Sequence, residues 1–447
     1  MNKQILQIIF LVITLIAIWA IIKFGIGLYS IPLWIIIFSV TKFNSMQLTS
    51  VLIVSEFFIG IDTLTLGPFS IIQIIGVSLL LSNIKAVKKN YFSNSVFLIL
   101  LLLLFYFSFS YYQYFRELSM APINWIFIYI LTIISFNGKK SDFHFVGWLT
   151  VISITSIALV NFIIQISFGI SAVKIIAFGN PNQIGFFSLY ALIYIIYLYG
   201  AFEKKNARVL KFLFYFNALC IVFTGSRLNT GMLLIFIILL GIYPIKGIWI
   251  KQKTLILSFA FLIIIIIIGG GIKTFFFRNN ENEELKSLTL SNLEDLNDSY
   301  LVSFTNARSK IYYDAIELIK EKPIFGNGFL SWNDKDNTYN SLITSNTGSR
   351  ISMHSTLLQY LAETGIIGLL LYLMYFLKIA HNGRKLIKGY FSKDYYYSGQ
   401  LITFITLFIF LGSTFDNHSL SYAQIHFIGG ISIVMISKVN NEQAHEY

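Results

Sequence analysis

Residues 5–22 of this 447-residue chain read ILQIIFLVITLIAIWAII, and this stretch alone sets the class of fold. An α-helix rises about 1.5 Å per residue, so roughly 20 apolar residues cross a hydrocarbon core about 30 Å thick. Only one lysine, Lys3, precedes the run, no small-residue cleavage site follows it, and many apolar runs come after it. We therefore interpret it as the first membrane-spanning helix and not as a signal peptide.

The composition extends this interpretation to the whole chain. Hydrophobic residues make up 56% of the sequence and charged residues 12%, whereas a soluble domain is about a quarter charged. The mean hydropathy is +0.72. We expect an all-α polytopic membrane protein. The single cysteine, Cys220, lies in an apolar run, which excludes disulfides and cysteine-ligated zinc.

The apolar runs predict about 12–14 transmembrane helices. The second and third are short or interrupted by Glu56 and Asp62. The candidate spans begin near residues 5, 27, 47, 67, 91, 121, 145, 182, 209, 228, 254, 355, 397 and 419.

Basic residues assign the two faces of the membrane. Of the 24 Lys and Arg residues outside the long loop at 273–353, alternation of the spans places 20 on one face. The positive-inside rule makes that face cytoplasmic, with both termini inside. The net charge of +12 then reflects topology and gives no evidence of nucleic-acid binding.

One connection between spans is long. Residues 273–353 hold 11 acidic and 9 basic residues, and alternation places them outside. A long polar segment in a compact chain usually carries function or is disordered. The expected organisation is an N-terminal bundle of about 11 helices at 1–272, this extracytoplasmic loop at 273–353, and about three C-terminal helices at 354–447.

The second half of the loop, NARSKIYYDAIELIKEKPIFGNGF, predicts a short amphipathic helix. Arg308, Tyr312 and Ala315 follow one helical stripe, and the proline and glycines, Gly326 and Gly328 among them, end the helix. Arg308 then lies at the edge of the apolar face and points toward the membrane. It either binds an anion or covers apolar surface with its stem.

Two further basic side chains belong to the same outer face. In TGSRLNTG, Gly225 lies in a small-residue turn and Arg227 starts a helix, where N-terminal amides suit an anionic ligand. The alternative for Arg227 is an interfacial anchor. His354 heads the span at 355–378 and is either a catalyst or a solvated cap. Three such residues on one side of the membrane favour a functional site.

Other candidate residues carry weaker signals. The amide of Asn182, in GNPNQIGFF, can cap a helix or hydrogen-bond a sugar, and Asp416 is either an auxiliary base or a turn residue. Glu363 lies about 13 Å along the helix from His354 and faces the other way, so the two cannot pair. A buried acid needs a partner, which we expect on another helix.

This set of residues suits glycosyl transfer at the outer face. ATP and nucleotide sugars are absent there, so the substrate must arrive already activated, as a polyprenyl-diphosphate-linked glycan does. Arginines bind the diphosphate and stabilise the charge that grows on it as the glycosidic bond breaks. Histidine titrates near neutral pH and can take the proton of the attacking hydroxyl. The reaction needs no metal and no other cofactor.

The motifs TGSRLNTGMLL, NARSKIYYDAIELIKEKPIFGNGF and HSTLLQYLAETGIIG, in this order, resemble the O-antigen polymerase and ligase superfamily. The turn GNPNQIGFF is similar to the family's asparagine-proline-asparagine turn, so the resemblance covers about residues 178–370. It departs from the family at Ser355, where asparagine usually follows the histidine, which puts any role of that amide in doubt.

The resemblance implies a GT-C-like glycosyltransferase in the bacterial cytoplasmic membrane, with undecaprenyl-diphosphate-linked glycans as substrates. It implies inversion at the anomeric carbon, with Arg227 and Arg308 on the diphosphate and His354 positioning or deprotonating the acceptor. Glu363 would hold the helix that presents His354. A chain-length regulator and a flippase of the same pathway are further expected partners.

Two activities of this superfamily remain open, together with one of another class. A polymerase joins lipid-linked repeat units into a surface polysaccharide such as O-antigen or capsule, and a ligase transfers the glycan to a lipid or cell-wall acceptor. We favour the polymerase, because the apparent spans outnumber those of the family's ligases and no feature suggests a fixed acceptor. A flippase is the alternative class. A carrier would need mid-membrane ionisable residues and related halves, and the sequence shows no internal repeat.

Overall fold

The computed structural model describes sixteen segments of the chain. The described residues are 3–23, 30–42, 44–59, 65–66, 69–70, 77–78, 94–116, 121–168, 181–202, 206–224, 226–242, 302–334, 353, 355–389, 392–415 and 423–446.

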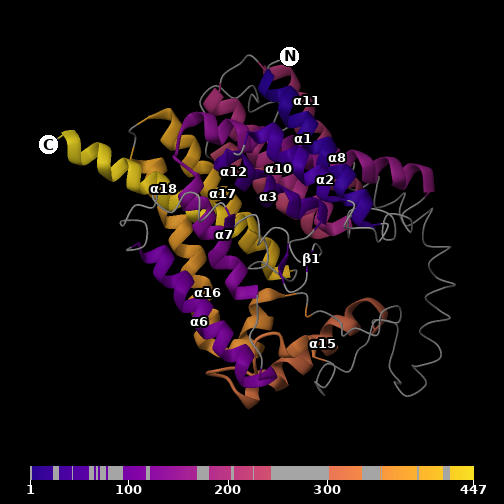
Figure 1. Cartoon of the computed structure of the whole chain (residues 1–447). Helices are drawn as coiled ribbons and strands as arrows, with labels where there is room; N and C mark the ends of the chain where they lie inside the picture. Colours follow the sequence, from indigo (N-terminus) through magenta and orange to yellow (C-terminus); the bar gives the residue numbers. More distant parts are fainter. Residues whose placement is uncertain are drawn as a thin grey trace.

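Helices dominate these residues and lie where apolar runs predict them (Figure 1). They are α1 (Lys3–Lys23), α2 (Ile31–Thr41), α3 (Ser45–Ile59), α6 (Ser95–Phe115), α7 (Ala121–Ser135), α8 (Lys140–Phe168), α10 (Pro181–Phe202), α11 (Ala207–Phe223), α12 (Arg227–Ile242), α15 (Val302–Glu321), α16 (Thr356–Lys388), α17 (Lys393–Phe415) and α18 (Ala423–Glu446).

The architecture confirms an all-helical polytopic membrane protein. Within the described residues, six helices are long and apolar enough to cross a membrane, and shorter apolar helices accompany them. Strands β1 (Thr65–Leu66) and β2 (Phe69–Ser70) form a small antiparallel hairpin where the fourth span was expected to begin. Most of that span, and the span expected near residue 254, lie outside the described residues.

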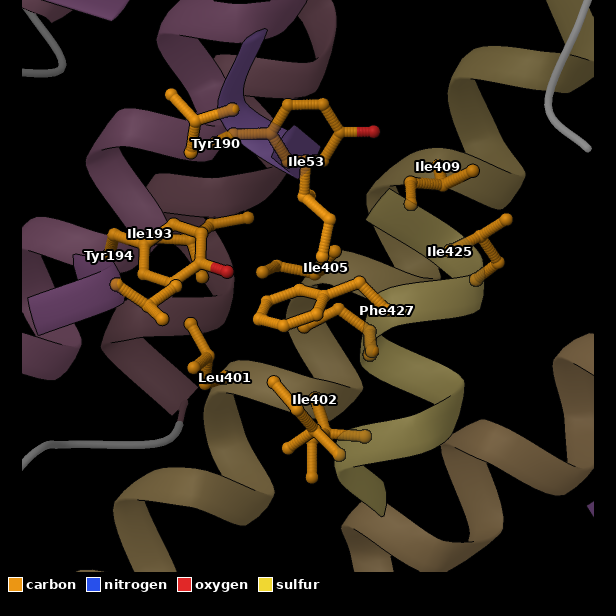
Figure 2. Packing of buried hydrophobic residues seen from close by; sticks show 14 of the residues in the cluster. Ile53, Tyr190, Ile193, Tyr194, Leu401, Ile402, Ile405, Ile409, Ile425 and Phe427 are labelled. Atoms are coloured by element: carbon orange, nitrogen blue, oxygen red, sulfur yellow. The ribbon is translucent and has the colours of Figure 1, made fainter. Parts of the chain in front are cut away.

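Helix α10 lies at the centre of the bundle. Of its apolar window 89% is buried, against 33% for α1. Helices α8, α11 and α17 pack around it. Figure 2 shows Tyr190 and Tyr194 of α10 facing Leu401 and Ile405 of α17, with Phe427 of α18 beside them. Aromatic and branched side chains fill this centre, so the bundle is held by packing among apolar surfaces.

Helix α6 lies at the edge of the bundle. Leu98, Leu102, Phe105, Phe109 and Tyr112 are exposed, and their spacing of three and four residues places them on one face. A continuous apolar face of this length on a membrane protein is a lipid-facing surface. The opposite face of α6 packs on α7 and α16.

Candidate active site

The long loop contains the expected amphipathic helix, α15, which ends before Pro323 as predicted. Ile311, Ala315 and Leu318 are buried, whereas Tyr313 is exposed, so the helix packs by one face. Arg308 lies one turn before Ile311 on that side of the helix. The structure thus places Arg308 within α15, although its side chain is not among those described.

Helix α15 packs on the beginning of α16. Its buried face shares a cluster with Trp332, Met353 and Ala362. Met353 precedes His354, which itself lies outside the described residues. Consecutive Cα atoms are about 3.8 Å apart, so His354 follows directly on a residue buried against α15. Arg308, as a residue of α15, therefore belongs to one packed unit, and so do the described residues that precede and follow His354 in the sequence. We call it the loop unit: α15, residues 322–334, Met353, and residues 355–364.

Ser355 begins α16 as its N-cap. Its Oγ accepts a hydrogen bond from the Leu358 N–H at 3.4 Å. Serine and asparagine are both favoured N-cap residues. Ser355, which stands where the family usually has asparagine, therefore caps the helix as an asparagine could.

Helix α16 is broken at Gly365. The residue has φ 64° and ψ −170°, which interrupts the helix. The rings of Tyr360 and Tyr372 lie 5.1 Å apart, whereas twelve residues of continuous helix span about 18 Å. The single span expected to start at residue 355 is therefore wrong. Residues 356–364 form a separate segment of the loop unit, and the long membrane helix begins after Gly365.

Residues 323–328, the turn that follows α15, bind both sides of this break through the backbone. The amides of Asn327 and Gly328 donate to the carbonyls of Ala362 and Glu363 at 3.1 and 2.7 Å. In return, the Ile366 amide donates to the Pro323 carbonyl at 2.9 Å. These bonds satisfy backbone groups that the broken helix would otherwise leave unpaired. The motifs PIFGNG at 323–328 and AETGIIG at 362–368 thus form one structural element.

Gly326 and Gly328 are required by the closeness of this contact. Their φ values are 76° and 121°, a region that side-chain-bearing residues seldom adopt. A Cβ at Gly326 would also collide with the Glu363 carbonyl, and one at Gly328 with the Tyr114 side chain. Both glycines allow the turn to pack closely against α16 and α6.

Glu363 is fully buried beneath the turn. Its Oε1 accepts hydrogen bonds from the Gln359 side-chain amide at 2.9 Å and from the Trp332 N–H at 3.3 Å. We expected its partner on another helix. One partner, the Trp332 N–H, belongs to the short 3-10 helix Ser331–Asn333 of the loop, and the other, Gln359, lies in the preceding turn of α16 itself. The carboxyl therefore joins the segment that follows His354 to the segment that follows α15.

Helix α6 supports the same turn from the membrane side. The Tyr106 hydroxyl donates to the carbonyls of Thr364 at 2.8 Å and Phe325 at 3.2 Å. The Ser110 hydroxyl accepts from the Phe329 N–H at 3.0 Å. The break in α16 is thereby fixed to a membrane-spanning helix as well as to the loop.

A second group of candidate residues lies at the ends of α10, α12 and α17. Asn182 and Arg227 stand at the beginnings of α10 and α12, with their side chains outside the described set. Gly185 directly faces the Asn229 side chain, so these two helix beginnings are side by side. Gly412, near the end of α17, likewise faces Phe186. Asp416, just past that end, and Gly225 are outside the described residues.

Contacts between helices place both groups at the same end of the bundle. The Tyr372 hydroxyl of α16 is hydrogen-bonded to Ser413 of α17 at 2.8 Å, next to Gly412 and its contact with α10. Ile366 lies about 9 Å along the helix from Tyr372, on the side of the loop unit. The structure thus brings the beginning of α12, which carries Arg227, to the same end of the bundle as α15, which carries Arg308, and the beginning of α16.

Three structural features were not predicted from the sequence. The break at Gly365, the bonds between the turn and α16, and the support from Tyr106 and Ser110 were all missed. Only the glycine that follows Glu363 in AETGIIG signalled an interruption, because glycine is disfavoured within a helix. Tyr106 and Ser110 carried no signal, since they lie in an unbroken apolar run.

Together, the bundle and the loop unit define a polytopic membrane protein whose long loop is fixed to its membrane helices. Residues 212–373 match the model of a family described as O-Antigen ligase. This match confirms the resemblance to the O-antigen polymerase and ligase superfamily over these residues, which run from α11 to beyond the break in α16. A search of curated proteins found no match.

Proposed function

We propose that this protein polymerises undecaprenyl-diphosphate-linked oligosaccharides at the outer face of the cytoplasmic membrane. The observation that carries the proposal is the loop unit, in which α15, with Arg308, packs against the residues on either side of His354. The whole unit lies within the segment that matches the O-antigen ligase family.

The reaction follows from the chemistry of these side chains. An acceptor hydroxyl oxygen attacks the anomeric carbon of the donor sugar, and a new C–O bond forms as the bond to the diphosphate breaks. The electron pair of that bond goes to the diphosphate oxygen, whose growing charge Arg227 and Arg308 stabilise. His354 takes the proton of the hydroxyl. Attack opposite the leaving group inverts the anomeric centre.

The position of Arg227 supports a shared site with Arg308. Its helix begins beside that of Asn182, at the end of the bundle that carries the loop unit. A guanidinium at a helix beginning acts together with free backbone N–H groups, which also attract anions. In this proposal Asn182 and Asp416 contact the sugar near the diphosphate.

The acceptor separates the polymerase from the ligase. Both use the same donor, so the site geometry suits either activity. Our preference for the polymerase rests on the number of expected spans and on the absence of a fixed-acceptor feature in the sequence. Transport is less well supported, because the buried acid Glu363 is engaged by the loop unit and not placed as a carrier's mid-membrane ligand.

Reconstituted vesicles test the proposal. Purified undecaprenyl-diphosphate repeat units are supplied to wild type and to Arg227→Ala, Arg308→Ala and His354→Ala, and product length is read on a gel. Lys320→Ala is the control, since Lys320 is an exposed cation on α15 that pairs with Glu317 at 2.7 Å. We expect a ladder from wild type and control only.

Other outcomes of this assay contradict the proposal in different ways. Wild type that acts only after a lipid acceptor is added is a ligase. Wild type that moves the lipid-linked unit across the bilayer without joining units is a flippase. A full ladder from the His354→Ala variant would remove the histidine from the mechanism.

A further inference from the structure

A groove lies between the C-terminal parts of α16 and α18, far from the loop unit. It holds a cavity of about 550 Å³. Its α16 wall carries His381, Arg384, Lys385 and Lys388. Spacings of three, four and seven residues place these side chains on one face of the helix. They lie roughly 30 Å along α16 from Gly365, at the face of the membrane that the sequence predicts to be cytoplasmic.

The bottom of the groove is apolar. Leu386 of α16 and Ile436 and Val439 of α18 line it, and each is buried. The basic side chains above them are exposed at the membrane surface. The groove therefore combines an apolar floor with a basic rim, and a ligand that fills it needs an apolar and an anionic part.

Within the part of the chain that the structure describes, the positive charge of the rim is not compensated by an ion pair. Ion pairs among the described residues join Lys140 to Asp394 and Lys320 to Glu317, and none involves the rim. Glu442 lies one turn beyond Val439 on α18, where its electrostatic interaction is with Tyr395. No acidic residue among those described lines the groove.

We propose that this groove binds the phosphate headgroup of an anionic phospholipid, with the acyl chain against the apolar floor. Arginine and lysine bind phosphate oxygens by charge-assisted hydrogen bonds, and basic pockets between membrane helices are suited to lipid headgroups. Topology alone explains basic residues at helix ends, but it does not require a cavity with an apolar floor. Free phosphate would bind the same basic side chains but would leave the apolar floor without a ligand. The proposal does not depend on the glycosyltransferase activity.

Native mass spectrometry of the full-length protein in detergent tests it. Dioleoyl phosphatidylglycerol and dioleoyl phosphatidylcholine are added in turn, and retained lipid is counted. The groove variant combines Arg384→Gln, Lys385→Gln and Lys388→Gln. The control combines Arg208→Gln, Lys42→Gln and Lys139→Gln, which removes the same charge from exposed positions elsewhere. We expect the preference for phosphatidylglycerol to fall at least about tenfold in the groove variant alone.

A second variant separates shape from charge. Val439→Trp fills the floor and keeps every basic residue, so we expect it to lose lipid as well. Size-exclusion profiles check that each variant is folded. Equal losses in the groove and control variants would mean a general surface-charge effect and overturn the proposal. Saturation by inorganic phosphate, with no retention of phosphatidylglycerol, would assign the groove to a free anion and overturn the lipid.

Discussion

At the scale of single residues, the carboxyl of Glu363 joins two segments of the loop unit. It is buried and accepts bonds from Gln359 and from the Trp332 N–H. A buried donor that loses its acceptor costs about 1–3 kcal/mol. The side chain at position 363 therefore has to place an acceptor oxygen near both donors, and replacing it with a shorter apolar side chain should destabilise the loop unit.

Glu363→Ala should lower the free energy of unfolding by about 2–4 kcal/mol, because two donors lose their acceptor. Glu363→Gln should stay near wild type, since its amide oxygen can accept both bonds. The measurement is the fraction of monodisperse protein after heating, read by size exclusion. An alanine variant as heat-resistant as wild type would show that these bonds contribute little.

Gly365 offers a second test at a single residue. Gly365→Ala places a side chain at φ 64° and against the Ile324 carbonyl. The combination of φ 64° and ψ −170° lies in a region essentially restricted to glycine, which alone costs a residue with a side chain roughly 1–3 kcal/mol, and the collision adds to it. Gly231→Ala in α12 is the matched control, because a Cβ there meets nothing within 4 Å. We expect the first variant to melt well below wild type and the second at or slightly above it.

At the scale of elements, the turn after α15 carries exposed apolar side chains next to the lipid-facing row of α6. Ile324 and Phe325 are exposed beside Tyr106 of α6, whose neighbour Phe105 belongs to the lipid-facing row. Ile366 of α16 is exposed on the other side of the break. The turn is thus predicted to dip into the outer leaflet and not to stand in water.

Cysteine labelling measures this depth. With Cys220→Ala as background, Phe325→Cys and Tyr313→Cys are each labelled with an environment-sensitive fluorophore in vesicles that contain brominated lipids. Tyr313 is 65% exposed on α15 and serves as the aqueous control. We expect the label at position 325 to be quenched and the label at 313 to be spared. Equal emission from both would place the turn outside the bilayer.

The elements that sequence patterns predicted are those whose signal is local. Apolar runs identified α1, α6 and α10, and the stripe through Ala315 identified α15 with its proline stop. The break in α16 was missed because its cause is tertiary. Residues 355–378 are apolar enough for one span, and the backbone of residues 323–328 together with Tyr106 satisfies the backbone groups that the interruption leaves unpaired. The site residues were predicted as a set on one side, while the contacts that join their elements had no local signal.

For the whole molecule, the side of the membrane on which the loop unit lies decides which glycosyl donor can reach it. The loop unit lies at one end of the bundle and the basic groove at the other. A polyprenyl-linked donor requires the loop unit to face outward, whereas nucleotide sugars are found on the cytoplasmic side. The orientation is thus a premise of the proposed reaction.

A membrane-impermeant maleimide tests the orientation in right-side-out vesicles. In the Cys220→Ala background, Lys320→Cys on α15 should react, and Lys139→Cys, before α8, should react only after the vesicles are opened. Both positions are exposed on the protein surface, so their labelling differs only in whether the maleimide can reach that side of the membrane. The reverse pattern would turn the loop unit inward and remove the basis for a lipid-linked donor.

The connection between the turn and the broken helix is made mainly by main-chain groups. Amides of Asn327, Gly328 and Ile366 and their carbonyl acceptors are present whatever side chains stand there. Random replacement should therefore be widely accepted at residues such as Ile324, where the carbonyl is used, and refused at the glycines. Because main-chain groups make this connection, the side chains on the surface of the turn can change during evolution while the backbone geometry of the loop unit is kept.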